Sequence, residues 1–210
     1  MFYSCGKCGA FRPDQIIDTE KNLVICPECG DARPFKRMPL YAIGGASGIG
    51  KSALCKAIAG KVNGVVVLDG DVFSDGKRYS TQNTEDFYEN VLRIAMNISQ
   101  SGVAVAIFHA GFGVPANLEH CIARRYFSEI HYLGIYCSDQ ELVKRLSTKS
   151  SAQGASGKGY ITAMKGFNAF FRSYYSPDSQ TPEMDKIDTT DSTPEKTAEK
   201  VIEWIQSKQS

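Results

Sequence analysis

One stretch decides the fold of this chain, Tyr41-Ala-Ile-Gly-Gly-Ala-Ser-Gly-Ile-Gly-Lys-Ser52. It begins as an apolar run, continues as a glycine-rich loop and leads into an amphipathic segment. Residues Gly45 to Ser52 match the pattern G-x-x-x-x-G-K-[ST] of a phosphate-binding loop. Glycines allow backbone N–H groups to converge on an anion, and the N-terminus of a following helix adds its positive dipole end. The stretch therefore predicts a strand, a phosphate-binding loop and a helix, in that order.

The positions of this loop have separate expected roles around a nucleoside triphosphate. Lys51 would reach the β- and γ-phosphates, and the Ser52 hydroxyl would occupy one position around Mg²⁺. A glycine-rich turn that matches the pattern by chance is the alternative. The apolar run before the loop and the amphipathic segment after it argue against that alternative. The predicted phosphate-binding residues are Gly45, Ala46, Ser47, Gly48, Ile49, Gly50, Lys51 and Ser52.

From Leu40 onward, apolar runs alternate with amphipathic segments, as in a parallel sheet covered on both faces. We therefore predict an α/β fold with a five-stranded parallel sheet and helices on both of its faces. The expected strands are 40–44, 64–69, 103–109, 130–137 and 185–188. The expected helices are 51–62, 84–100, 115–127, 139–148, 160–175 and 194–207.

Length, charge and cysteine content limit the class of protein. The 210 residues suffice for one sizeable core and a small appendage. The net charge of +1 gives no general attraction to nucleic acid or anionic membrane. The longest apolar runs, such as 103–108, are too short to span a bilayer, and the N-terminus lacks a secretory-signal pattern. Seven cysteines, an odd number, favour a reducing compartment over a disulfide scaffold, so we expect a cytoplasmic protein.

Two cysteine pairs mark residues 1–37 as a separate unit. The pairs, Cys5-Gly-Lys-Cys8 and Cys26-Pro-Glu-Cys29, are separated by 17 residues, which is within the range of a four-cysteine zinc site. This segment resembles a zinc ribbon. Four thiolates would complete the zinc tetrahedron, so the expected Zn²⁺ is structural and not catalytic. A redox C-x-x-C motif is the alternative for either pair taken alone.

The role of this ribbon has three interpretations, which are docking RNA, contacting a protein, or bracing the rest of the chain. Residues 1–37 hold six Lys/Arg and five Asp/Glu, a balance too even to favour nucleic acid. Bracing or protein contact is therefore the preferred interpretation. The second domain is expected to span residues 38–210.

Two carboxylates follow the second strand expected in this domain, at Val67-Leu-Asp-Gly-Asp71. In an open parallel sheet, the carboxyl ends of the strands face the ligand crevice. Asp69 and Asp71 are two positions apart, so both can point to the same side. One could hold the water shell of a metal ion, and the other could accept a proton from an attacking hydroxyl. A polar turn after a buried strand is the alternative.

The region from Leu40 to Ser210 resembles the P-loop kinases of small molecules, a group that includes nucleoside, shikimate, gluconate and adenylylsulfate kinases. The loop has the G-x-x-G-x-G-K-S form favoured there, and Asp69-Gly-Asp71 resembles the D-x-D motif of several of these families. The resemblance implies ATP and Mg²⁺, with Asp71 as the base or hydroxyl ligand and Asp69 as the carboxylate on the metal side. It also implies a small-molecule acceptor, which we expect to be a nucleoside or nucleotide.

Further candidate residues follow the third and fourth strands. His109 could touch the acceptor or the γ-phosphate, and a histidine that caps the strand end is the alternative. Residues 148–160 are rich in small side chains and lie where the resembling kinases have a flexible closing lid. Such lids supply arginines, but residues 146–159 contain none. The expected substitutes are Arg145, Lys149, Lys158 and Arg172.

Transfer of phosphate from ATP to a small acceptor is the first functional hypothesis. An NTP-binding regulatory or RNA-associated module is the second, because the lid lacks arginines and the ribbon offers a contact surface. A kinase that acts on an RNA end would unite both features, although the charge balance does not favour RNA.

Overall fold

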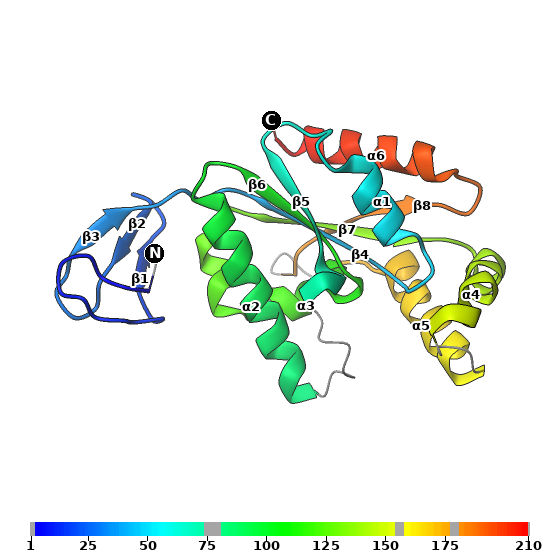
Figure 1. Ribbon diagram of the computed structural model, residues 1–210, viewed down its shortest axis with the longest axis horizontal. Helices are drawn as coiled ribbons and strands as arrows, with labels where there is room; N and C mark the ends of the chain where they lie inside the picture. The colour runs from blue at the N-terminus through cyan, green and yellow to red at the C-terminus, as the bar shows by residue number, and fades with distance from the viewer. Residues whose placement is uncertain (1–2, 74–80, 154–157, 177–180, 210) are drawn as a thin grey trace.

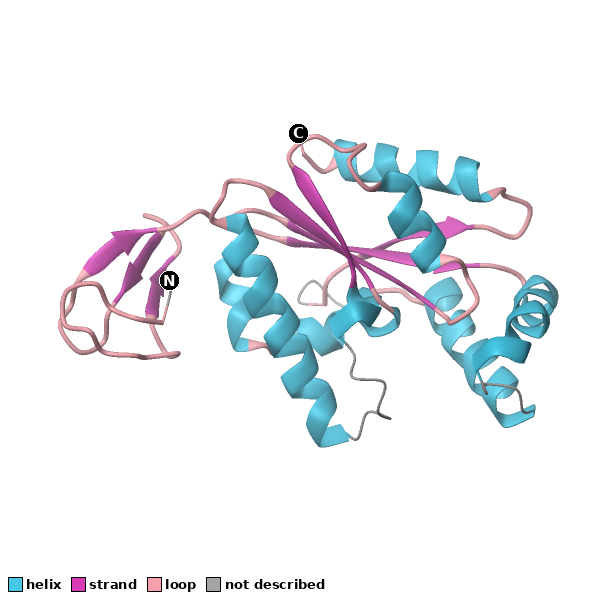
Figure 2. Cartoon of the chain, in the orientation of Figure 1, coloured by secondary structure: helices cyan, strands magenta, loops and turns pink. Residues whose placement is uncertain are grey.

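Two sheets organise the chain in the computed structural model, which describes residues 3–73, 81–153, 158–176 and 181–209. The larger sheet has five strands with helices on both faces, and the smaller has three strands near the N-terminus (Figure 1). Figure 2 shows that the small sheet carries loops and strands only, whereas the helices surround the larger sheet. Within the described ranges, no helix is both long enough and apolar enough to cross a membrane.

The five-stranded sheet is parallel throughout and confirms the predicted fold class. Its strand order is β5-β6-β4-β7-β8, which places β4 at the centre. Each strand begins and ends within one residue of its predicted bounds. The strands are β4 (Leu40–Gly45), β5 (Val65–Asp69), β6 (Ala104–Phe108), β7 (Ile130–Tyr136) and β8 (Met184–Asp188).

Helices cover both faces of this sheet (Figure 1). One core joins side chains of α1 and α6 to one face, and a second core joins α2, α3 and α5 to the other. The α-helices are α1 (Lys51–Ile58), α2 (Thr81–Ser99), α3 (Pro115–Leu118), α4 (Asp139–Gln153), α5 (Lys158–Ser173) and α6 (Pro194–Ser207). Three 3₁₀ turns complete the unit, η1 (Gly70–Phe73), η2 (Ala110–Gly113) and η3 (Ile122–Tyr126).

The burial of the central strand β4 on both faces explains why its sequence is a continuous apolar run. Leu40 and Ala42 belong to the core under α2, whereas Tyr41 and Ile43 belong to the core under α1 and α6. All four are fully buried. A strand that is buried on both faces has no polar side to show, so the period-two alternation of a half-buried strand is absent.

The predicted helix 115–127 is wrong as a single element, because the chain breaks at Cys121 into α3 and η3. Cys121 has an extended conformation, with φ −66° and ψ 139°. The Ala123 N–H donates to the Glu89 carboxylate of α2 at 3.1 Å, so it is not available to continue the earlier helix. A partner more than thirty positions away in the sequence thus ends the helix.

Helix α2 begins at Thr81, before its predicted start at residue 84, and two other helices end several residues from their predicted ends. Helix α1 was expected to reach residue 62 but ends at Ile58, and Gly60 follows with a left-handed φ of 74°. Helix α4 was expected to end at residue 148 but continues to Gln153. The segment expected to form a flexible lid, 148–160, is therefore partly helical, and its residues 154–157 lie outside the described part of the chain.

Two glycines allow the central strand to touch the turn that follows β6. A Cβ built on Gly44 would lie 2.5 Å from the Gly113 Cα and 2.8 Å from a ring carbon of Phe171. A Cβ on Gly113 would meet the Gly44 Cα at the same distance. Because the closest atoms belong to backbone, no side-chain rotation can relieve such a contact. Glycine is therefore required at both positions for β4 and η2 to pack together.

We expect Gly44→Ala to lower the free energy of unfolding by at least about 2 kcal/mol, because the added methyl group overpacks a site bounded by backbone. The control is Gly166→Ala in α5, where a Cβ meets nothing within 4 Å. That change should instead stabilise the protein by up to about 1 kcal/mol, because alanine favours helix over glycine. Chemical denaturation followed by circular dichroism measures both values. Equal effects of the two substitutions would contradict the close contact.

Candidate functional site

The loop that follows β4 has the backbone of a phosphate-binding loop. Gly48 and Gly50 adopt left-handed φ angles of 88° and 107°, which residues other than glycine rarely adopt. Gly45 lies against the Ile135 carbonyl oxygen, where a Cβ would come within 2.7 Å. Helix α1 begins directly after the loop at Lys51. The geometry therefore places the first N–H groups of a helix at the end of a glycine-rich loop, which suits an anion.

Lys51 lies over this loop. Its side chain is 9% exposed, and its ammonium donates to the carbonyl oxygens of Gly45 at 2.8 Å and Ala46 at 3.1 Å. Ser52, the next residue of α1, is exposed. A lysine cation and a serine hydroxyl thus stand at the same end of the sheet, as the motif predicts.

A pocket of about 380 Å³ opens beside the loop. Arg145 of α4 forms one wall and joins three parts of the chain. Its guanidinium donates to the Ile49 carbonyl at 3.4 Å and to the Thr189 carbonyl at 2.8 Å, and it pairs with Glu141 at 2.8 Å. The lining residues are Gly48, Ile49, Gly50, Ala53, Leu54, Glu141, Arg145, Thr148, Thr189, Ser192, Pro194 and Thr197.

The two predicted aspartates lie at the carboxyl edge of the sheet. Asp69 is the last residue of β5, and its carboxylate accepts a hydrogen bond from the Asp71 N–H at 3.2 Å. The side chain of Asp71 is 63% exposed and faces His109, with 3.8 Å between Asp71 Oδ1 and His109 Nε2. Gly70 makes this approach possible, since a Cβ there would lie 2.6 Å from the His109 Cβ.

His109 is fixed between a turn and a group of aromatic rings. Its Nδ1 accepts a hydrogen bond from the Gly111 N–H at 3.2 Å, so the histidine caps η2 as the structural alternative predicts. Phe87 lies 5.0 Å from the imidazole between ring centroids, and Phe112 lies 5.7 Å away at right angles. Burial lowers the pKa of His109 to about 4, although the Asp71 carboxylate raises it. The imidazole is therefore neutral near pH 7.

The lid candidates are less well placed. Neither Lys158 nor Arg172 lines the pocket beside the loop. Lys158 is exposed at the start of α5, and Arg172 pairs with Asp139 at 3.4 Å. The side chain of Lys149 is outside the described part of the chain. Among the candidates whose side chains the structure describes, Arg145 is the one that lines the pocket.

Sequence reasoning missed the residues that complete the pocket. Glu141 and Thr189 hold Arg145 in place, and Thr189 is itself tied to the Tyr136 carbonyl by its N–H at 2.9 Å. Glu141 and Arg145 are four positions apart on one helix, a spacing that favours an ion pair and could have indicated this contact. Thr189 carried no comparable signal, because its role depends on the packing of β8 beside β7.

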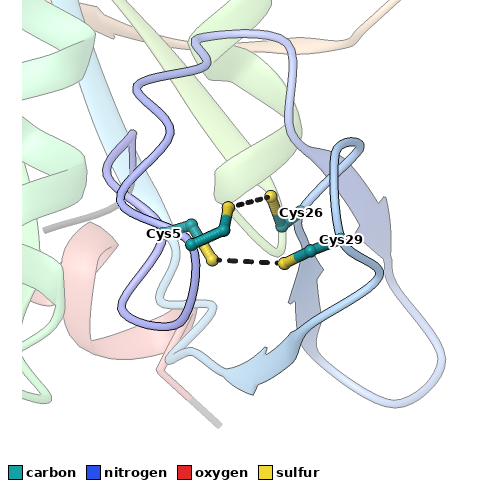
Figure 3. Close-up of side chains that lie close together, drawn as sticks. Cys5, Cys26 and Cys29 are labelled. Carbon is teal, nitrogen blue, oxygen red and sulfur yellow. Dashed lines mark hydrogen bonds between the residues drawn. The ribbon is translucent and has the colours of Figure 1, made fainter.

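The four N-terminal cysteines form a cluster with the dimensions of a zinc site. All four sulfurs lie within 4.8 Å of one another. The Cys5 and Cys29 sulfurs are 3.6 Å apart, and those of Cys8 and Cys26 are 3.8 Å apart. Figure 3 shows Cys5, Cys26 and Cys29 pointing toward one another from two separate loops. Four sulfurs at about 2.3 Å from a tetrahedral zinc ion would lie about 3.8 Å apart, so the cluster fits Zn²⁺.

The two cysteine loops have matching backbones. The Gly9 N–H donates to the Cys5 carbonyl, and the Gly30 N–H donates to the Cys26 carbonyl, at 3.0 and 2.9 Å. Both glycines have left-handed φ angles, 74° and 70°. The backbone amides of Cys8 and Lys7 lower the pKa of the Cys5 thiol to about 7, whereas, despite a backbone hydrogen bond from Asp31, desolvation and the neighbouring thiols raise the pKa of Cys29, so Cys5 ionises before Cys29. Among the residues that the structure describes, no other group of three or more His, Cys, Asp or Glu is placed to hold an ion.

The small sheet of this ribbon packs against the larger unit. Its strands are β1 (Ile16–Asp18), β2 (Leu23–Ile25) and β3 (Ala32–Pro34), paired antiparallel. Phe35, just after β3, is buried edge-on against Tyr126 of η3 at 5.9 Å. Lys36 exchanges two backbone hydrogen bonds of 2.9 Å with the Gln100 side chain, and the Arg125 guanidinium reaches the Pro13 carbonyl at 3.1 Å. The ribbon therefore rests on η3 and the end of α2.

Comparisons with known proteins agree with this fold. No protein-family model matches the sequence, and no curated protein matches it significantly. Among solved structures, the chain is similar to a sugar kinase from Janibacter (TM-score 0.56, 14% identity, 81% of this chain and 95% of that one). It is also similar to a tunicamycin resistance protein from Deinococcus radiodurans (TM-score 0.57, 15% identity, 80% and 96%).

A third similar structure is the APS kinase of Mycobacterium tuberculosis in complex with AMPPNP and APS. Its TM-score is 0.54 at 18% identity, over 82% of this chain and 99% of that one. At such identities the likeness establishes the fold. The resemblance to P-loop small-molecule kinases, predicted from the two motifs, is therefore confirmed at the level of architecture.

We expect one zinc ion per chain in the purified protein, measured by mass spectrometry of metals. Cys26→Ser should lose that zinc and lower the melting temperature, because metal binding supplies much of the folding free energy of so small a unit. Cys121→Ser is the matched control, since its thiol is buried outside the cluster and already donates to the Asn117 carbonyl. Zinc absent from the wild type, or retained by Cys26→Ser, would contradict the assignment.

Proposed function

We propose that the chain is an ATP- and Mg²⁺-dependent phosphotransferase that moves the γ-phosphate to a small acceptor. One observation carries the proposal: the glycine-rich loop with Lys51 and the Asp71–His109 pair occupy the same carboxyl edge of one parallel sheet. This edge is where open α/β sheets bind ligands. A donor site after β4 and an acidic group after β5, two places away in the same sheet, suit transfer and not binding alone.

The nucleotide would lie along the loop. The loop amides and Lys51 would hold the phosphates, and the pocket beside Arg145 has the volume and the largely apolar lining expected for a base. The planar guanidinium of Arg145, fixed by Glu141 and Thr189, can stack on a flat ring. The AMPPNP complex of the similar APS kinase supports ATP as the nucleotide.

Magnesium would arrive with ATP and neutralise charge on the phosphates. The Ser52 hydroxyl and the Asp69 carboxylate supply the hard oxygen donors that Mg²⁺ prefers. Ser52 is exposed at the start of α1, and Asp69 ends the strand two places away in the sheet. We therefore propose both residues as magnesium ligands, as the sequence predicts.

Asp71 would serve as the base. The proton of the acceptor hydroxyl passes to its carboxylate while the hydroxyl oxygen forms a bond to the γ-phosphorus. The bond from that phosphorus to the β–γ bridging oxygen breaks, and ADP leaves with the electron pair. Lys51 offsets the negative charge that accumulates on the phosphates. The exposure of Asp71 suits this role, because an acceptor must reach it.

A nucleoside or nucleotide remains our proposed acceptor. Phe87 and Phe73 are partly buried and belong to elements that flank Asp71 and His109, so either could offer a face to a ring. Tyr88, the residue after Phe87, is instead a core residue whose hydroxyl accepts a hydrogen bond from Asn117 at 3.1 Å.

We place the boundary between ribbon and kinase-like domain between residues 37 and 38, and we propose that the ribbon is a brace. Two of its arginines are already engaged in ion pairs within the ribbon, Arg12 with Asp14 and Glu28, and Arg33 with Asp31, which favours a brace over a nucleic-acid contact. All seven cysteines are free, which suits a reducing compartment such as the cytoplasm. Lys149, Lys158 and Arg172 stay candidates for contacts with bound phosphates.

ADP release from Mg²⁺-ATP against nucleosides, nucleotides, sugars and RNA ends tests this function. We expect one acceptor class to stimulate release, and Asp71→Asn to reduce the rate by about 10²- to 10⁴-fold, the usual contribution of a general base. Affinity for ATP should change little. The matched control is Glu203→Gln, which removes an exposed carboxylate of α6.

Two results would count against the proposal. An Asp71→Asn variant that transfers phosphate at the wild-type rate would remove the role of Asp71. Tight ATP binding with no acceptor-dependent ADP release would instead support an NTP-binding regulatory module, and a salt-dependent complex with RNA would identify its partner.

A further inference from the structure

The hydrogen-bond pattern of His109 fixes which ring nitrogen carries the proton. Its Nδ1 lies 3.2 Å from the Gly111 N–H and accepts its hydrogen bond. A nitrogen that accepts from a backbone amide holds no proton, so in the neutral ring the proton is on Nε2. The Nε2–H is therefore a donor, and it is the nitrogen nearest to Asp71.

The surroundings of His109 hold this donor in one direction. The His109 side chain is 11% exposed, whereas that of Asp71 is 63% exposed. Phe87, Phe112 and Tyr88 pack around the imidazole with ring centroids 5.0 to 6.2 Å away. Gly70 brings the backbone between the two aspartates against the His109 Cβ. A packed donor thus stands beside a carboxylate that is largely exposed to solvent.

We propose that His109 is a positioning residue that donates its Nε2–H to one oxygen of Asp71 and so aims the other oxygen at the acceptor hydroxyl. This role rests on the proposed phosphotransfer. The present separation of 3.8 Å exceeds a hydrogen bond, but a side-chain rotation of the exposed Asp71 can close it. A base held in one orientation gains rate, because misplacement by about 1 Å can cost 10²-fold.

A neutral imidazole suits this purpose better than a lysine or arginine would. It orients the carboxylate through a hydrogen bond without adding a permanent positive charge next to the base. A permanent charge would stabilise the ionised carboxylate and weaken it as a proton acceptor. Histidine also provides a second nitrogen for the turn that follows β6, so one side chain joins that turn to Asp71.

Two substitutions of His109 separate its proposed hydrogen bond to Asp71 from its role in capping the turn η2. In His109→Asn, the amide oxygen can replace Nδ1 and accept from Gly111, but the Nε2–H is lost. In His109→Gln, the longer side chain can place an amide N–H near the position of Nε2, but the cap is weakened. A purely structural histidine predicts that Asn is the better replacement, whereas the positioning role predicts that Gln is.

The test measures kcat, the KM for the acceptor and the Kd for ATP, with the best acceptor of the panel. We expect His109→Asn to lower kcat by about 10- to 100-fold at unchanged ATP affinity, and His109→Gln to restore most of the loss. In the Asp71→Asn background, His109→Asn should have little further effect, because the two residues act as one unit. A His109→Asn enzyme with wild-type kcat, or additive losses in the double variant, would overturn the proposal.

A spectroscopic readout keeps the inference testable without turnover. The chain has three histidines, so ¹H–¹⁵N spectra of the imidazoles can be assigned by substitution. We expect the His109 signals of the Nε2–H tautomer in the wild type, and a shift of its ¹⁵Nε2 resonance in Asp71→Asn. A proton on Nδ1, or no response to Asp71→Asn, would refute the pairing. Absence of kinase activity with an intact spectral response would refute the proposed function, and with it the aiming of a base, while leaving the His109–Asp71 pairing in place.

Discussion

The backbone contact between Gly44 and Gly113 is the constraint on which the rest of the site depends. Gly44 is the last residue of β4 before the phosphate-binding loop begins, and Gly113 closes the turn that His109 caps. A Cβ at either position would lie 2.5 Å from the Cα of the other glycine, so the strand and the turn would have to move apart. The contact therefore sets the spacing between Lys51 on one side and the Asp71–His109 pair on the other, which phosphotransfer requires to be close.

The ribbon also packs against the middle of α2. The Arg93 guanidinium lies over the Tyr3 ring at 5.4 Å and pairs with Glu89 at 2.8 Å, and the same Glu89 carboxylate caps Ala123 in η3. Phe87, two residues before Glu89 on the same helix, packs on His109. The unit that carries the four-cysteine cluster thus rests on the helix whose other residues surround the acidic edge. This packing gives the ribbon a physical reason to be present without a nucleic-acid partner.

The sequence predicted what short-range spacing determines. The loop from Gly45 to Ser52 and the four-cysteine cluster both follow from residue types at fixed intervals, and the edge position of Asp69 follows from a rule for parallel sheets. Features made by distant partners could not be predicted. The break at Cys121 depends on Glu89, and the placement of Arg145 depends on Thr189, which only the pairing of β7 with β8 brings near.

The central claim is that Lys51 and its loop bind the phosphates of a nucleoside triphosphate. Calorimetric titration with Mg²⁺-ATP tests it most directly, using Lys51→Ala and, as control, Lys56→Ala on the exposed side of the same helix. Loss of a charge-assisted contact of about 2–3 kcal/mol should weaken binding by about 100-fold in Lys51→Ala and leave Lys56→Ala close to the wild type. Equal affinity of Lys51→Ala and the wild type would contradict the account.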